Sequence, residues 1–195
     1  RYEQIVSLPP SNQGYWVLYD RCCRPASIVN LFASAAESFS YFTWIPSQSG
    51  SLIVNSSPQF TDTLLSIICE SDTSYISNSA IDPDGDSLVY SLVDPTKGQT
   101  NNLQPAQAYT GVLLNPYAFP PQSVVYATSY NLNNLLGIGG FANVDSNTGL
   151  TRFLSLNLGR FVATVEITEY RNNQIIGVTR RNMQLISSIC PNNTM

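Results

Sequence analysis

Three carboxylates stand at alternate positions in the segment IDPDGDSL, and their type and spacing suit metal chemistry better than any other residues here. Asp82, Asp84 and Asp86 are separated only by Pro83 and Gly85. Hard oxygen ligands at this density are what Ca²⁺ prefers in proteins. The segment therefore predicts a calcium site. The alternative is an acidic turn whose side chains accept hydrogen bonds from backbone N–H groups.

The calcium prediction needs ligands from outside the segment, because Ca²⁺ takes about six to eight oxygens. The loop is not an EF-hand, since it has glycine at its fourth position and valine at its twelfth. An EF-hand needs glycine at the sixth position and glutamate at the twelfth. Glu70, Asp72 and Glu169 are candidates to complete the site, and the sequence does not choose among them.

Residues for catalysis are scarce in this chain. It has no histidine, which removes the commonest general base and the commonest metal ligand together. Lys97 lies in a polar stretch without a neighbouring motif, and no GxSxG sequence is present. Glu166 and Glu169 would point to opposite faces of a strand, which argues against a carboxylate pair for glycoside hydrolysis. We therefore expect a protein that is not an enzyme.

The composition excludes further classes of function. Charged residues make up 11% of the 195 residues, against about 25% in a typical soluble domain. Phosphate contacts need clustered Lys and Arg, so we expect no nucleic-acid partner. No apolar run approaches the roughly 20 residues of a membrane span. Because the chain opens at Arg1 without an initiator methionine or signal peptide, we expect a processed product or a piece of a longer protein.

Aromatic residues gather in a proline-rich stretch of weak periodicity, residues 94–140. Long stretches of this kind inside a compact domain are often functional. Tyr109, Tyr117, Phe119 and Tyr126 could form a surface that binds a carbohydrate or a protein receptor. The alternative is that these rings fill the core beneath the stretch.

Four cysteines, Cys22, Cys23, Cys69 and Cys190, form an even set without metal-binding spacing. They predict disulfides and hence an oxidising, extracytoplasmic compartment. Adjacent residues on a strand point to opposite faces, so we expect no bridge between Cys22 and Cys23. That leaves cross-pairing of these two with Cys69 and Cys190. The alternative is that some remain buried free thiols.

Strand signals dominate the chain, because β-branched and aromatic runs alternate with Pro, Gly, Asn and Ser. The one segment with helix propensity is 31–38. Phe161 to Ile167 shows the period of two that is typical of a half-buried strand, and residues 171–174 form a turn into the next strand. Strands are predicted over residues 14–22, 38–45, 63–69, 87–93, 122–126, 160–170 and 174–186.

Strands that recur about every ten residues, with turns between them, are typical of β-sandwiches. A polar, turn-rich segment at 50–60 separates two strand-bearing parts. We expect an all-β protein with a first sandwich unit over 1–58 and a second over 59–195, which carries the long loop at about 94–140. The first unit has few strands, so we expect it to be incomplete or completed by a neighbouring chain.

A set of short segments occurs in a fixed order along the chain. They are YDRCCR (19–24), IVN (28–30), NSSPQF (55–60), AIDPDGDSLVYSL (80–92), DSNTGL (145–150), EYRN (169–172), TRRNMQ (179–184) and Cys190. In this order they resemble extracellular proteins of the Bacteroidetes that carry Ig-like or cadherin-like domains. Such proteins commonly end in a gliding-motility-associated sorting domain for type 9 secretion. The family often has a cysteine near Val165 to Ile167, which this chain lacks.

The resemblance implies a non-catalytic module of the bacterial cell surface, such as part of an adhesin or a filament, with neighbouring copies or domains as partners. Strand addition to an open sheet edge would be its mode of assembly. The family also implies O-glycosylation at Asp-Ser/Thr followed by an apolar residue, which Thr63 and Ser87 fit. The alternative function is a carbohydrate- or receptor-binding module that uses the Tyr-rich stretch.

Overall fold

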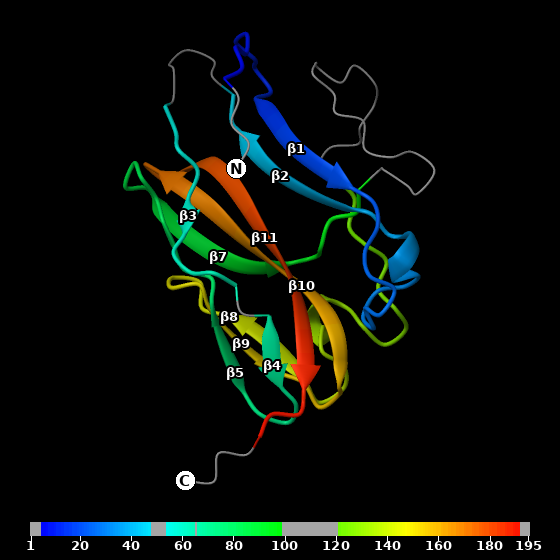
Figure 1. Ribbon diagram of the computed structural model, residues 1–195. Coiled ribbons are helices and arrows are strands. Elements are labelled where there is room, and N and C mark those ends of the chain that lie inside the picture. Colours follow the sequence, from blue (N-terminus) through cyan, green and yellow to red (C-terminus); the bar gives the residue numbers. More distant parts are fainter. Residues whose placement is uncertain (1–4, 48–53, 65, 99–120, 192–195) are drawn as a thin grey trace.

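The structure is a computed structural model that describes residues 5–47, 54–64, 66–98 and 121–191 (Figure 1). Its regular elements are strands, except for two single turns of 3₁₀ helix, η1 (Ser34–Ala36) and η2 (Leu132–Asn134). The all-β expectation is confirmed. The strands are β1 (Tyr15–Arg21), β2 (Phe39–Ile45), β3 (Gln59–Phe60), β4 (Ile67–Cys69), β5 (Ser74–Ser77), β6 (Ala80–Ile81), β7 (Ser87–Val93), β8 (Phe141–Val144), β9 (Leu150–Leu154), β10 (Gly159–Arg171) and β11 (Gln174–Ser188).

The main sheet has the strand order β1-β2-β11-β10-β7, and β4 pairs in parallel with the last residues of β11. A second sheet has the order β5-β9-β8, and β3 pairs with β6. The long β10–β11 hairpin crosses the whole molecule, from the β1–β2 side to the second sheet (Figure 1). Its turn residues, Asn172 and Asn173, have φ of 52° and 62°. Positive φ at both positions is what a tight hairpin turn requires, and asparagine tolerates it.

The core lies between the main sheet and the second sheet. Phe153 from β9 packs with Phe161, Val165 and Leu185 of the main sheet, and all four are fully buried. The opposite face of β10 is buried as well, because a smaller cluster of Ile28, Leu31, Val124 and Val162 covers it. The period of two therefore correctly predicts the core face of β10, but the other face is not left to solvent as that pattern implied.

The predicted strands agree with the structure where the strands are long. The structure contains strands at five predicted positions, as β1, β2, β7, β10 and β11. At 63–69 only the end is a strand, β4, and at 122–126 the chain makes isolated bridges to Leu31 and Thr96 instead of a strand. The predicted helix at 31–38 shrinks to the single turn η1.

Residues 1–58 do not contribute a sheet of their own among the described strands. β2 pairs with β11 at Trp44–Val178 and Thr43–Thr179, so β1 and β2 extend the main sheet. Residues 28 and 160 also form a bridge. Long-range pairing of this kind leaves no signal in local composition. The division into units over 1–58 and 59–195 stays a prediction. Within the described residues, neither 3₁₀ turn has the length to cross a bilayer.

The disulfides differ from the predicted cross-pairing. Cys69, at the end of β4, is bonded to Cys190 after β11, with their Cα atoms 5.4 Å apart, and Cys22 is bonded to Cys23. The prediction was wrong because β1 ends at Arg21. The two adjacent cysteines lie beyond the strand, where the alternation of side chains between faces no longer applies. The peptide bond between them is cis.

Candidate functional site

The acidic loop, Asp82 to Asp86, joins β6 to β7 and is folded by its own first side chain. Asp82 Oδ1 accepts hydrogen bonds from the backbone N–H groups of Asp84 (2.9 Å) and Asp86 (3.0 Å). This is the local turn that aspartate favours. Gly85 has φ of +81°, a conformation that other residues rarely adopt. One carboxylate of the loop is thus already used to hold the loop itself.

A guanidinium from the end of β10 meets the outer part of the loop. Arg171 Nε donates to Asp86 Oδ1 (2.7 Å), and its Nη2 donates to Oδ2 (2.6 Å). Asp84 Oδ2 lies 3.9 Å from Nη2, and Nη1 donates to the carbonyl of Val54 (3.0 Å). The bidentate geometry with Asp86 is the strong form of this interaction. Asp86, followed by Asp84 and Asp82, raises the pKa of Arg171.

The segment after residue 53 completes this cluster from a third direction. The N–H of Ser56 donates to Asp84 Oδ2 (2.6 Å). Asn55 Oδ1 accepts from Arg171 (3.3 Å), and its Nδ2 donates to Glu169 Oε2 (2.7 Å). Asn55 therefore bridges a cation and a carboxylate that both belong to the end of β10.

Glu169 is the buried member of the cluster. Its side chain is fully buried and lies against Gly177 of β11, where an added Cβ would meet Oε1. Burial raises the pKa of Glu169, the hydrogen bond from Asn55 lowers it, and the aspartates of the loop raise it further. The absence of a side chain at Gly177 is what gives this carboxylate room.

The three aspartates come together as predicted, with ligand oxygens within 4.8 Å of one another. Two buried carboxylate oxygens, Asp82 Oδ2 and Glu169 Oε1, have no hydrogen-bond partner among the described residues. Glu70 and Asp72 lie in the turn after β4, outside this group. Oxygen donors of this kind suit Ca²⁺, but Arg171 already supplies a positive charge at the loop. Calcium binding stays a prediction.

The other predicted site residues lie apart from this loop. Tyr109, Tyr117 and Phe119 fall outside the described residues. Tyr126 packs against both core clusters, and its hydroxyl donates to Asp94 Oδ1 (2.9 Å). Burial and this hydrogen bond raise the pKa of Tyr126.

The two predicted glycosylation residues lie on opposite sides of the acidic loop in the sequence. Thr63 is exposed after β3, and Ser87 is exposed at the start of β7. Both hydroxyls therefore lie on the surface, and their glycosylation stays a prediction.

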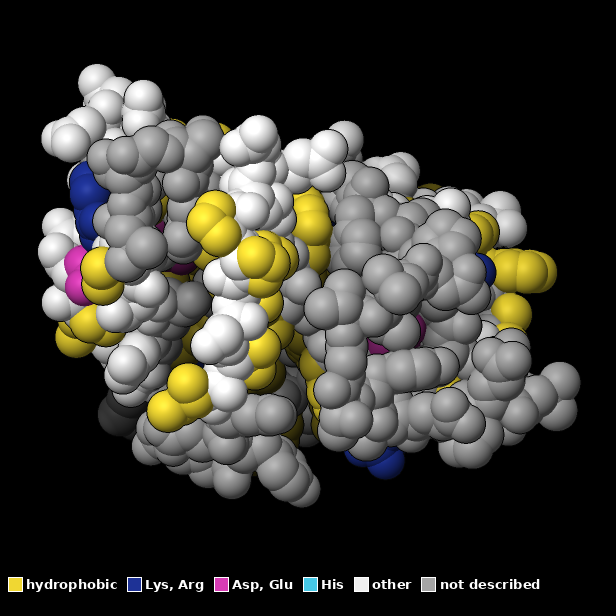
Figure 2. Space-filling model, turned by 90° about the horizontal axis from the view of Figure 1, so that it is seen from above, with side chains coloured by type: hydrophobic (Ala, Val, Ile, Leu, Met, Phe, Trp, Pro, Cys, Tyr) yellow, Lys and Arg dark blue, Asp and Glu magenta, His cyan; other side chains and the backbone are white. Residues whose placement is uncertain are grey.

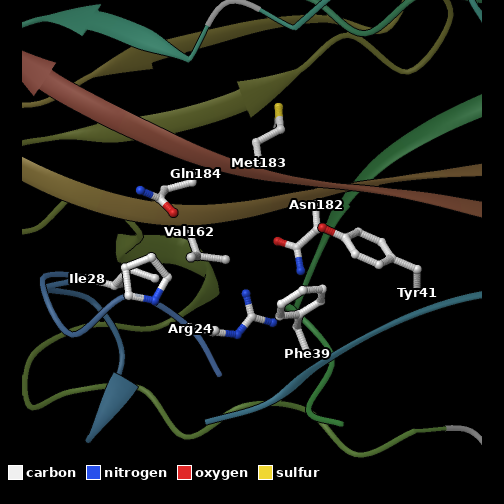
Figure 3. Close-up of a pocket in the computed structure, with 9 residues that line it drawn as sticks. Arg24, Ile28, Phe39, Tyr41, Val162, Asn182, Met183 and Gln184 are labelled. Atoms are coloured by element: carbon white, nitrogen blue, oxygen red, sulfur yellow. The ribbon is translucent and has the colours of Figure 1, made fainter. Parts of the chain in front are cut away.

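A second cluster was not predicted from the sequence. A hollow of about 190 Å³ opens on the face of the main sheet that points away from the core (Figure 3). Its aromatic side chains are Phe39 and Tyr41 of β2, and its amides are Asn182 and Gln184 of β11. Figure 3 shows Met183 pointing away from these amides, toward the core side. The remaining lining residues are Arg24, Pro25, Ile28 and Val162.

Arg24 is the charged residue of this hollow, and only 7% of it is exposed. Its Nη2 donates to the carbonyl of Thr96 (2.9 Å), and its guanidinium lies 5.6 Å from the centroid of the Phe39 ring. Burial lowers the pKa of Arg24, whereas Tyr41 and Glu37 raise it. A guanidinium nevertheless stays protonated in proteins. Arg24 follows the bonded cysteines and precedes a proline in the sequence. This context does not indicate a binding residue, so only the fold reveals the role of Arg24 in the hollow.

The fold and these two clusters define a disulfide-bonded, all-β protein with a sandwich-like core. No protein-family model matches the chain, and no match was found among curated proteins or solved structures.

Proposed function

We propose that this protein is a non-catalytic extracellular module with a structural or adhesive role, built as an Ig-like or cadherin-like sandwich at the bacterial cell surface. The observation that carries the proposal is that all four cysteines are in disulfides. Structural disulfides persist in oxidising compartments and are rare in the cytosol. Cys69–Cys190 closes a span of 121 residues, so it holds the β4 region to the last long strand.

The weakly charged surface supports the same proposal. Among the described residues, the face seen in Figure 2 shows several hydrophobic side chains and few charged ones. Serine and asparagine, 24 and 18 in number, supply most of the polarity that charges supply elsewhere. A surface of this kind suits contacts with other proteins or glycans better than contacts with charged polymers.

The assembly partner that we propose is a second copy of this chain, joined at β1. This strand ends the main sheet and has seven residues, and β2 is its partner among the described strands. Val17 and Tyr19 on β1 are 53% and 56% exposed, and Tyr41 beside them on β2 is 37% exposed. An exposed terminal strand with apolar side chains is a template for strand addition.

The experiment is light scattering after size exclusion, with negative-stain microscopy, over a range of protein concentrations. We expect oligomers or filaments that Val17→Lys disrupts, because a charge on an edge strand opposes pairing. The matched control is Tyr75→Lys, since Tyr75 is 62% exposed on β5, which ends the second sheet. A strictly monomeric protein at all concentrations, or disruption by Tyr75→Lys alone, would contradict assembly at β1.

The compartment is tested separately, by counting thiols in protein purified from its native source and unfolded without reductant. We expect no reactive thiol, since all four cysteines are bonded. A count of four free thiols in fresh native material would contradict an extracellular location. Because this count does not depend on oligomerisation, failure of one part of the proposal can be told from failure of the other.

A further inference from the structure

The hollow beside Arg24 is large enough for a small ligand. Its volume is about 190 Å³, which is the space that roughly six water molecules fill in the liquid, at about 30 Å³ each. That is close to the size of one hexose ring, and below the range of drug-sized pockets. Its rim is open to solvent, since Tyr41 is exposed and Asn182 and Gln184 are half-buried.

The charge of Arg24 is not matched within the described part of the chain. Its guanidinium forms no ion pair with a carboxylate there, and its Nε is buried without a hydrogen-bond partner. Burial lowers the pKa of Arg24 and the charge of Glu37 raises it, but Glu37 Oε1 pairs with Lys97 at 3.3 Å, and its buried Oε2 has no hydrogen-bond partner among the described residues. Buried guanidinium groups are normally paired, because an uncompensated buried charge is costly. No carboxylate of the described residues is therefore hydrogen-bonded to the Arg24 guanidinium.

The remaining lining fits a ligand with hydroxyl groups and a ring. The amides of Asn182 and Gln184 each offer two donor hydrogens and one acceptor oxygen. They share a face with Val162, which pairs with Gln184 in the sheet register. Phe39 and Tyr41 add ring faces, with their ring centroids 5.3 Å apart. Aromatic faces with a few convergent polar groups are the usual lining of a small-ligand site.

We propose that this hollow binds an acidic saccharide unit, with Arg24 pairing its carboxylate. Asn182 and Gln184 then hydrogen-bond ring hydroxyls, and Phe39 and Tyr41 pack against the ring. A guanidinium matches a carboxylate in bidentate geometry, which selects a uronate over a neutral sugar. The site is distinct from the acidic loop and from the β1 edge, and it does not depend on the structural role proposed above.

The test is an NMR titration of the intact, oxidised protein with sodium galacturonate. The matched probes are galactose, which lacks the carboxylate, and acetate, which lacks the ring. We expect galacturonate to shift the side-chain amide signals of Asn182 and Gln184, with galactose and acetate each at least about tenfold weaker, that is about 1.4 kcal/mol. A third probe, N-acetyl-alanyl-alanine, is titrated in the same way. It tests whether the hollow prefers the C-terminal carboxylate of a peptide to that of galacturonate.

Three variants locate the binding. Arg24→Lys keeps the charge but loses the fork geometry, so we expect at least about tenfold weaker galacturonate binding. Arg152→Lys is the matched control, because Arg152 is exposed on β9 in the other sheet. If Arg24→Lys does not fold, Asn182→Leu on the half-buried rim provides the same test. Each variant's fold is checked by its amide spectrum.

The proposal is overturned by any of three results. One is the absence of galacturonate shifts in a folded protein at tens of millimolar probe. The second is binding of galactose, acetate or the dipeptide as tight as that of galacturonate. The third is galacturonate binding that Arg24→Lys and Asn182→Leu both leave unchanged. Selective uronate shifts at Asn182 and Gln184, lost in these variants and kept in Arg152→Lys, support it.

Discussion

The acidic loop and the Arg24 hollow treat charge in opposite ways. In the loop, the guanidinium of Arg171 is held by Asp86 in two hydrogen bonds, and its remaining donors reach Asn55 and the Val54 carbonyl. In the hollow, the guanidinium of Arg24 is more deeply buried, yet it makes one hydrogen bond, to the Thr96 carbonyl. The first charge is satisfied by the chain itself, and the second is not.

This difference teaches that a dense motif and an open binding position are separate things. The loop is conspicuous in the sequence because its aspartates lie at alternate positions, but most of their oxygens accept hydrogen bonds from the chain itself. The hollow is inconspicuous because its residues come from distant segments, yet it keeps an unmatched charge and open amides. A ligand gains most where the folded chain leaves polar groups without partners.

The largest effect on stability is expected from replacing Asp86, the buried partner of Arg171. The Asp86 side chain is 4% exposed. Asp86→Ala removes both charge-assisted hydrogen bonds to Arg171 and leaves the other carboxylates without this link. We expect the free energy of unfolding to fall by about 2–3 kcal/mol. In a chain of this size that lowers Tm by about 5–10 °C, as measured by calorimetry.

The control for this change is Asp72→Ala, at an exposed aspartate whose carboxylate, among the described residues, accepts a hydrogen bond only from the N–H of Thr73. We expect a loss within about 0.5 kcal/mol there. Equal losses of stability at Asp72 and Asp86 would show that the bidentate pair does not stabilise the fold. The acidic loop would then no longer be the region where the chain satisfies its own charge.

The buried carboxylate Glu169 is expected to give the next effect, in the pH dependence of stability. Its pKa is raised in the folded state, first by burial. The folded protein therefore binds a proton that the unfolded chain has already released, at pH values between the ordinary glutamate pKa and the raised one. Stability therefore falls as pH rises from the ordinary glutamate pKa through the raised one, and it is regained as pH falls back across this interval.

Glu169→Gln removes this dependence while keeping the shape. We expect a higher Tm than that of the unmodified protein at pH 7, and a difference that shrinks toward pH 4.5 and below. The control is Asp145→Asn, because hydrogen bonds from Thr148 and Asn147 lower the pKa of Asp145. That group stabilises the folded state above its ordinary pKa and loses this effect as pH falls, so the control has the opposite sign.

The long strands of the fold could be predicted from the sequence, and the short ones could not. Residues 87–93 coincide with β7, and the Asn172–Asn173 turn lies where it was expected, because local propensity and periodicity are strong there. β5 and β9 were missed, since they have only four and five residues and pair with each other from far apart in the chain. Local composition carries no record of such pairing.

The same limit applies to the sites. The closeness of Asp82, Asp84 and Asp86 follows from their adjacency in the sequence, so it could be predicted. That Arg171 would be their partner depends on the register of β10 against β7, which sets Tyr170 opposite Ser87. The hollow requires four segments to meet at one sheet face, and the Cys22–Cys23 bond depends on where β1 ends. Neither has a local signal.

Calcium provides a smaller effect that sharpens the comparison. If Arg171 is the cation of the acidic loop, adding Ca²⁺ to the unmodified protein should raise Tm only slightly. Arg171→Gln removes the guanidinium and leaves the carboxylates to a metal ion, so we expect a larger rise of Tm with Ca²⁺ in this variant. Thermal melting with and without chelator measures both.

The calcium response has its own control and its own contradiction. Adding Asp84→Asn to the Arg171→Gln variant should reduce the gain, since it removes a carboxylate of the site. A large rise of Tm with Ca²⁺ in the unmodified protein, abolished by Asp84→Asn alone, would contradict this expectation. The loop would then bind the metal ion while Arg171 is present.

The smallest effect is expected where the charge is unmatched. Arg24→Met keeps the length and packing of the side chain beside Phe39 and removes a buried charge that has no carboxylate partner in the described part of the chain. Removing a buried charge also removes the cost of its desolvation, which offsets the loss of the hydrogen bond to the Thr96 carbonyl. We therefore expect the free energy of unfolding to stay within about 1 kcal/mol of that of the unmodified protein, by denaturant titration. A loss as large as that from Asp86→Ala would mean that the chain satisfies Arg24 as fully as it satisfies Arg171. The reason to look for a ligand in the hollow would then disappear, because residues that are kept for binding commonly contribute little to stability.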